Sequence, residues 1–218
     1  MTRSLLSSLA LIAVLSLALA NVALAQELSP VKLPAPKMDG GKPLMQALKE
    51  RQSIREYSDQ KLSQQMLSNL LWATWGINRP DGRRTAPSAS NRQEVDVYVV
   101  LPEGAYVYDA RANGLNPVVA GDLRGATGTQ PFPATAALNL VYVADMAKAG
   151  RSATDPQQQL NVGADVGFIA ENAYLFCASE GLATVVRALV NRTELAKLLK
   201  LRPDQQIVLA QSIGYPKK

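Results

Sequence analysis

Two arginines flank one serine in the segment RQSIREY, at Arg51, Ser53 and Arg55. In an extended chain alternate side chains share one face, so two guanidinium groups and a hydroxyl would converge on one point. That set suits a phosphate, which accepts paired hydrogen bonds from arginine and a further one from a hydroxyl. The alternative is a solvated helix end, where basic side chains complement the helix dipole.

A second group of hydrogen-bonding side chains lies in the segment PSASNRQ, from Pro87 to Gln93, directly before the apolar run VDVYVV. Ser88, Asn91 and Gln93 offer donors and acceptors that could pair with the edge of a flat heterocycle or with a sugar chain. The alternative is an ordinary polar loop, although loops beside a rigid strand often carry binding groups.

Residue types that the chain lacks restrict the chemistry further. There is no histidine among the 218 residues, which excludes imidazole acid–base chemistry and histidine metal sites. No carboxylate cluster has metal-ligand spacing, so we expect no metal. The only cysteine, Cys177, lies in the apolar stretch LFCA and is expected to be a buried, inert thiol. Catalysis, if present, would therefore come from a bound cofactor, and no catalytic side chain is assigned.

The charge distribution argues against a nucleic-acid partner. The formal net charge is +5, but the basic residues are scattered and form no dense run. A local anion site fits this pattern better than a basic surface does.

The first 25 residues resemble a targeting segment. Arg3 precedes a long apolar run that ends in Ala23-Leu24-Ala25, the small-x-small pattern of a signal-peptidase site. We expect residues 1–25 to be a signal peptide and the mature chain to begin near Gln26. The mature protein would then be periplasmic or secreted and would have no membrane span. An uncleaved anchor is the alternative, since the run is nearly long enough to cross a bilayer.

The elements that must position these groups mix helices and strands without a regular β-α-β alternation. Residues 26–41, rich in proline and glycine, are expected to be an extended linker before one domain at 42–218. Periodicity and end signals predict helices at 43–51, 63–75, 155–181 and 192–201. They predict a hairpin at 95–110 that turns at 103–104, strands at 134–145 and 205–216, and a short strand or extended segment at 182–190. No prediction is made for residues 112–133. The order of elements indicates an α+β fold with a mixed or antiparallel central sheet flanked by helices.

Residues 155–181 form the longest predicted helix, with Pro156 near its start and Gly181 at its end. It is apolar on more than one face, which is typical of a helix in a large core or in an oligomer interface.

Five segments, taken together and in order, resemble the nitroreductase family of FMN-dependent oxidoreductases, which includes thiazoline/oxazoline dehydrogenases. The resemblance covers about residues 42–216. The matching segments are RQSIREY, APSASNRQEVDVYVV, LNLVYVAD, ADVGFIAENAYLFCASEGLATVV and IVLAQSIGYP.

The resemblance implies an α+β fold and a homodimer with FMN in two grooves at its interface. In the family, the first motif and the chain end contact the FMN phosphate and ribityl chain. The Ser-rich loop reaches the cofactor from the other subunit. The segment after the long helix lies against the flavin ring. The cofactor-binding residues it implies are Arg51, Ser53, Arg55, Pro87, Ser88, Asn91, Gln93, Val186, Arg187 and Lys217.

Two positions depart from the family pattern. Glu94 follows the loop glutamine, where the family often has an apolar residue, and only Lys217 and Lys218 follow the GYP step, where the family usually has further basic residues.

The predicted function is an exported FMN-dependent oxidoreductase. It would pass hydride or electrons between a donor such as NAD(P)H and a small conjugated acceptor of the nitroaromatic or quinone type, or would oxidise a bound substrate. The alternative is a flavin-free relative that binds a small molecule or a partner protein in the dimer groove.

Overall fold

The computed structural model describes residues 28–150 and 154–218, and the predicted signal peptide lies outside them. The described residues contain one seven-stranded sheet in the order β1-β4-β3-β2-β5-β7-β6. All its neighbouring strands are antiparallel. The predicted α+β class is therefore confirmed, with an antiparallel sheet. The strands are β1 (Val31–Lys32), β2 (Val95–Leu101), β3 (Gly104–Asp109), β4 (Gly114–Ala120), β5 (Leu138–Asp145), β6 (Ala183–Arg187) and β7 (Gln205–Gly214).

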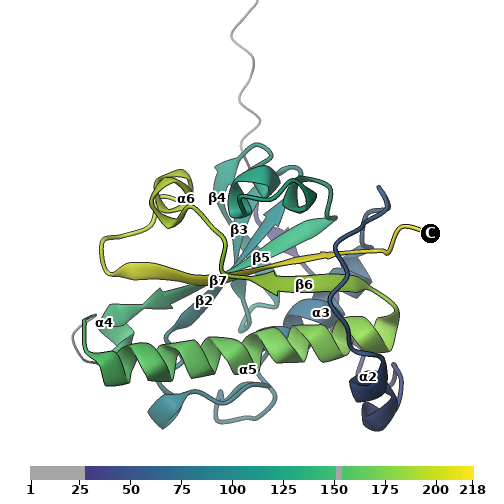
Figure 1. Cartoon of the computed structure of the whole chain (residues 1–218). Coiled ribbons are helices and arrows are strands. Elements are labelled where there is room, and N and C mark those ends of the chain that lie inside the picture. The colour runs from purple at the N-terminus through teal and green to yellow at the C-terminus, as the bar shows by residue number, and fades with distance from the viewer. Residues whose placement is uncertain (1–27, 151–153) are drawn as a thin grey trace, which may run out of the picture.

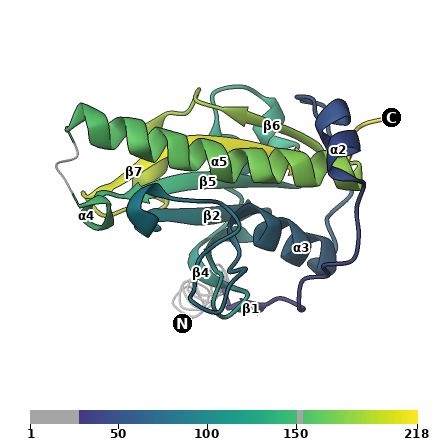
Figure 2. The same ribbon diagram turned by 90° about the horizontal axis from the view of Figure 1, so that it is seen from below.

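Helices cover both faces of this sheet. They are α2 (Leu44–Glu50), α3 (Gln64–Trp75), α4 (Met146–Ala149), α5 (Pro156–Glu180) and α6 (Arg192–Leu198), with short 3-10 turns η1 (Ala89–Asn91), η2 (Arg124–Thr127) and η3 (Phe132–Ala134). In Figure 1, α5 runs along one face of the sheet with α2 and α3 on the same side, whereas α6 lies over the opposite face. Figure 2 shows the whole length of α5 lying across the sheet.

Strand β5 is the centre of the fold, and all eight of its residues are buried. Leu140 and Tyr142 point into the core under α3 and α5, whereas Val141 and Val143 point into a second core under α6. A strand covered on both faces has a continuous apolar sequence, which is why LNLVYVAD is recognisable as a buried strand.

Helix α5 begins and ends where the sequence predicts. The Asp155 side chain caps its first turn by accepting from the Gln157 N–H, and Gly181 closes it in the left-handed region at φ 70°. The helix buries Val166, Ile169 and Ala173 against the sheet. Its opposite face is uncovered near the N-terminal end.

The predicted linker differs from the structure. Val31 and Lys32 form β1, which pairs with Gly114 and Leu115 of β4, and Leu33 is buried in the core. The flanking prolines are tolerated because β1 is an edge strand, where a missing N–H breaks no central ladder. The sheet therefore begins within the segment that composition alone marks as a tether.

Two smaller differences concern proline. Pro43 is the N-cap of α2 and not its first helical residue, so the helix begins at Leu44. Strand β4 lies in the stretch without a prediction, because Asn116 and Pro117 interrupt its apolar pattern. They are tolerated because β1 pairs only with the first two residues of β4.

Among the helices of the described ranges, none is both long and apolar enough to cross a membrane.

Candidate functional site

Arg51 is the C-cap residue of α2, so the first motif begins at a helix end, and the chain continues from there as an extended segment. Arg51 has φ −58° and ψ 122°. The Arg51 guanidinium carbon lies 5.4 Å from the centre of the Tyr174 ring on α5. The Ser53 hydroxyl lies 2.9 Å from the Tyr174 hydroxyl. Arg51 and Ser53 thus share one face, as alternate residues of an extended segment do, while Arg55 is exposed.

Strand β6 is joined to the same segment. The Val186 N–H donates to the Tyr174 hydroxyl at 2.9 Å. The Ile54 N–H donates to the Thr184 carbonyl, also at 2.9 Å. Two elements 130 positions apart in the chain are therefore held together at the C-terminal end of α5.

The end of the chain runs antiparallel to residues 56–58. The Lys217 N–H donates to the Glu56 carbonyl at 3.2 Å, and the Ser58 N–H donates to the Tyr215 carbonyl at 2.9 Å. In this register Lys217 lies opposite Glu56, the residue after Arg55. Within the described ranges no ion pair involves Arg51, Arg55 or Lys217. Arg51, Arg55 and Lys217, called here the cationic cluster, lie on the extended segment after α2 and on the chain end that pairs with it.

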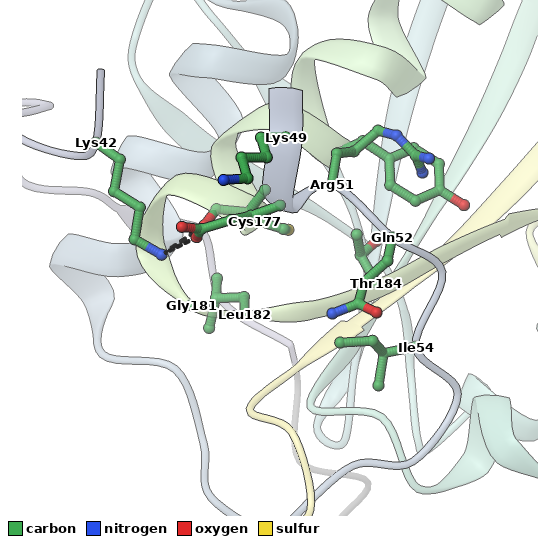
Figure 3. A pocket seen from close by; sticks show the side chains of 12 residues that line it. Lys42, Lys49, Arg51, Gln52, Ile54, Cys177, Gly181, Leu182 and Thr184 are labelled. Carbon is green, nitrogen blue, oxygen red and sulfur yellow. Dashed lines mark hydrogen bonds and ion pairs between the residues drawn. The ribbon is translucent and has the colours of Figure 1, made fainter. Parts of the chain in front are cut away.

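A cavity of about 450 Å³ opens beside this cluster. Figure 3 shows Lys42 on one side of it and Arg51 on the other, with Lys49 between them. Glu50 is the acidic residue in the lining, and its carboxylate is bound by Lys42 at 2.5 Å. Cys177 contributes to the wall but is fully buried, as predicted, and burial raises the pKa of its thiol.

The Ser-rich loop lies elsewhere, against the N-terminal half of α5. The Ala89 N–H donates to Asp165 Oδ2 at 2.8 Å. Within the loop, the Ser88 hydroxyl accepts from the Gln93 N–H at 3.0 Å, and Gln93 Nε2 donates to Asn91 Oδ1 at 3.1 Å. Pro87 and Asn91 are exposed.

Three residues of this loop have positive φ values: Ser90 and Asn91 at 54°, and Gln93 at 50°. Non-glycine residues in this region cost about 1 kcal/mol or more each, and such strain is concentrated at functional sites. The loop is held in this shape from outside, since Arg84 Nε donates to Gln93 Oε1 at 2.8 Å and stacks over Trp75.

One chain does not bring the two clusters together. Asp165 holds the loop and Tyr174 holds the first motif, nine positions apart on α5. At 1.5 Å per residue this separation is about 13 Å along the helix axis.

Glu94, where the sequence departs from the family pattern, is 1% exposed, and its Oε2 has no hydrogen-bond partner among the described residues. Burial, together with the neighbouring Asp165 carboxylate, raises the pKa of Glu94 to about 7. Because Asp165 is also buried, two acidic groups meet beneath the Ser-rich loop.

The Arg187 side chain is used inside the chain. It is 6% exposed and donates to Ser212 Oγ, Thr127 Oγ1 and Asn139 Oδ1 at 2.6–3.0 Å. Burial lowers the pKa of its guanidinium to about 10. Any ligand contact from this position would have to come from the backbone.

The backbone directly after β6 offers a free donor. The Val186 N–H is taken by Tyr174, and the alternation of an antiparallel strand turns residues 185 and 187 toward β7. The next N–H on the outer edge is that of Ala188, an exposed residue whose N–H has no partner in the described part of the chain.

Sequence patterns did not indicate Tyr174 or Lys49. Tyr174 is one large residue on an apolar helix, and its partners are 121 and 12 positions away. Lys49 is one of several exposed lysines, and its part in the cavity depends on how α2 packs against α5.

The fold and this site agree with the comparisons to known proteins. A sequence profile of the Nitroreductase family matches residues 48–215. A Methanocaldococcus jannaschii protein provisionally named a nitroreductase is 30% identical over 169 residues, 73% of this chain and 85% of that protein. The chain belongs to the nitroreductase family, and its class is that of the flavin-type oxidoreductases.

Solved structures give the same result. The crystal structure of a protein from Ralstonia eutropha, provisionally described as a nitroreductase, is similar with a TM-score of 0.83 and 42% identity, covering 88% of this chain and 92% of that one. A chain of the Escherichia coli microcin synthetase McbBCD complex is similar in fold, with a TM-score of 0.66 and 18% identity over 92% of this chain and 82% of that one.

Proposed function

We propose that the protein is an FMN-dependent oxidoreductase whose cofactor phosphate binds at the cluster of Arg51, Arg55 and Lys217. The carrying observation is that Arg51 and Arg55, on one extended segment with the Ser53 hydroxyl, and Lys217, on the chain end that pairs with this segment, make no ion pair within the described ranges. A dianionic phosphate supplies the missing charge and accepts the paired hydrogen bonds that a guanidinium offers.

The other polar groups fit the remainder of the cofactor. Ser53 would donate to the ribityl chain or the phosphate. The N–H of Ala188 is the donor on the outer edge of β6 that remains for the flavin ring. When bound, FMN would supply hydride and electron transfer, for which the described residues offer no side chain of their own. The chain's part is to bind, orient and shield the cofactor.

We also propose a homodimer, which the position of the Ser-rich loop supports. Pro87, Ser88 and Asn91 can meet the phosphate cluster only if they come from a second copy. The uncovered face of α5 supports such a pairing. Leu160 and Phe168 are 66% and 48% exposed there, and Gly163 and Gly167 have open space above them. Small residues flanked by apolar ones allow a second helix to approach closely.

The proposed reaction passes electrons from a donor such as NAD(P)H to a small conjugated acceptor of the nitroaromatic or quinone type. Export through the signal peptide at residues 1–25 is part of the proposal, and the cofactor would then be captured after translocation. A flavin-free relative that binds a small molecule or a protein in the same groove is the competing function.

Colour distinguishes these functions. The purified full chain, given equimolar FMN and then desalted, should be yellow and should bleach with dithionite. Bleaching by NADH or NADPH, and recovery on adding a nitroaromatic or a quinone, would identify the donor and the acceptor. A colourless protein that leaves FMN fluorescence unchanged would favour the flavin-free alternative.

A further inference from the structure

The hydroxyl of Tyr174 lies where the first motif and β6 meet. It is within 2.9 Å of both the Ser53 hydroxyl and the Val186 nitrogen, and its ring lies under Arg51. The side chain is 6% exposed, so its polar atom depends on protein partners.

The chemistry of these contacts fixes a direction. The Val186 N–H can only donate, so the Tyr174 oxygen accepts from it. The Tyr174 proton then needs an acceptor, and among the described residues Ser53 Oγ is the one within reach. When Ser53 Oγ accepts the Tyr174 proton, the hydroxyl proton of Ser53 is not used in this hydrogen bond. Because Ser53 is exposed, that proton points out of the protein as a donor.

We infer that Tyr174 is a positioning residue that turns Ser53 into an outward hydrogen-bond donor, holds Arg51 over its ring, and links both to β6. The inference rests on the proposed function, since the acceptor for Ser53 is an oxygen of the FMN phosphate or ribityl chain. In this role Tyr174 acts through Ser53 and Arg51. The Tyr174 hydroxyl makes Ser53 Oγ the donor of the site, and the Tyr174 ring fixes the position of the Arg51 guanidinium.

Tyr174→Phe isolates the hydroxyl, because the ring under Arg51 is kept. FMN affinity, measured by quenching of flavin fluorescence, should fall about tenfold, the scale of one hydrogen bond with its orphaned partner. Ser53→Ala should lower the affinity by a similar factor. In the double variant the loss of FMN affinity should stay at about tenfold, and the two single losses should not multiply, since Tyr174 acts through Ser53.

Tyr108→Phe is the matched control. Tyr108 is 7% exposed, and its hydroxyl has one side-chain partner, Asn113 at 3.2 Å, at the opposite end of the sheet. Tyr108→Phe should lower the thermal stability about as much as Tyr174→Phe does, and it should not change the FMN affinity. A structural role alone would make Tyr174→Phe behave like this control.

Amide hydrogen exchange gives a readout that needs no cofactor. The Val186 amide should exchange faster in Tyr174→Phe than in the wild type and in Tyr108→Phe. If the wild type binds FMN and Tyr174→Phe binds it equally well, or if the two losses multiply in the double variant, the inference is wrong while the proposed function stands. A wild type that does not bind FMN would overturn the proposed function, and this inference with it.

Discussion

The two ends of α5 organise polar groups in opposite ways. At the C-terminal end, Tyr174 hydrogen-bonds to Ser53 and Val186, and Arg51 lies over its ring without an ion-pair partner in the described ranges. At the N-terminal half, Asp165 and Glu94 bring two acidic groups together in the core beneath a strained loop. The first region is ready to accept an anion. The second region is built to hold the shape of a loop, which presents its polar atoms outward.

The acidic region should respond most strongly to pH. The folded pKa of Glu94, about 7, is above its ordinary value of 4.5, so the folded state binds more protons between these values. The stabilisation by protonated Glu94 is full below pH 4.5 and is lost as pH rises through 7. At about 1.4 kcal/mol per pKa unit, the loss is on the order of 3 kcal/mol.

Glu94→Gln tests this difference, because the amide keeps the shape without the titration. Urea unfolding between pH 4.5 and 8 should show this part of the pH dependence in the wild type and not in the variant. Glu103→Gln is the control, since the exposed Glu103 pairs with Lys61, which lowers its pKa out of this range. Equal slopes for the wild type and Glu94→Gln would show that the acidic region does not differ in this way.

The cationic region should lose binding before it loses stability. Arg51→Ala removes a half-buried guanidinium that no carboxylate pairs, so the free energy of unfolding should change little. FMN binding should weaken by about 2–3 kcal/mol, the scale of charge-assisted hydrogen bonds. The measurement is FMN titration alongside urea unfolding. Arg111→Ala, at an exposed turn far from the cluster, should change neither quantity, and a similar loss of affinity there would refute the assignment.

A smaller effect separates packing from binding at the same end of α5. Cys177→Ser places a hydroxyl in a fully buried position and should lower the free energy of unfolding by about 1–2 kcal/mol. FMN affinity and turnover should be retained in the folded protein. Cys177→Ala, which stays apolar, should cost less than serine does. Selective loss of turnover in a stable Cys177→Ser protein would assign the thiol a role in the reaction.

The contrast between these regions also explains what the sequence could predict. Local signals sufficed for α5, because Pro156 and Gly181 act within one turn of its ends. They also sufficed for β5, whose apolar run reflects burial on both faces. Local signals failed for β1 and β4, because the prolines beside β1 are tolerated at an edge strand and Pro117 lies in the part of β4 that β1 does not cover.

The site was predictable only in part for the same reason. Arg51 and Ser53 share a face because the spacing of an extended chain requires it. The contact that orients them comes from Tyr174, more than a hundred positions away, and no local pattern marks it. Arg187 shows the reverse case, since the family resemblance assigned it to the cofactor site and the fold uses its side chain to bind Thr127, Asn139 and Ser212.

The central claim is that the cationic region of one chain and the Ser-rich loop of a second chain form one FMN site. Arg51→Ala and Asn91→Ala should each weaken FMN binding when studied separately. The decisive measurement is FMN stoichiometry after the two variants are unfolded together and refolded as a mixture. A shared site predicts that mixed dimers regain one intact site each, about a quarter of all sites for random pairing in a twofold dimer. No recovery in the mixture, with wild-type protein refolded in the same way binding FMN fully, would contradict the claim.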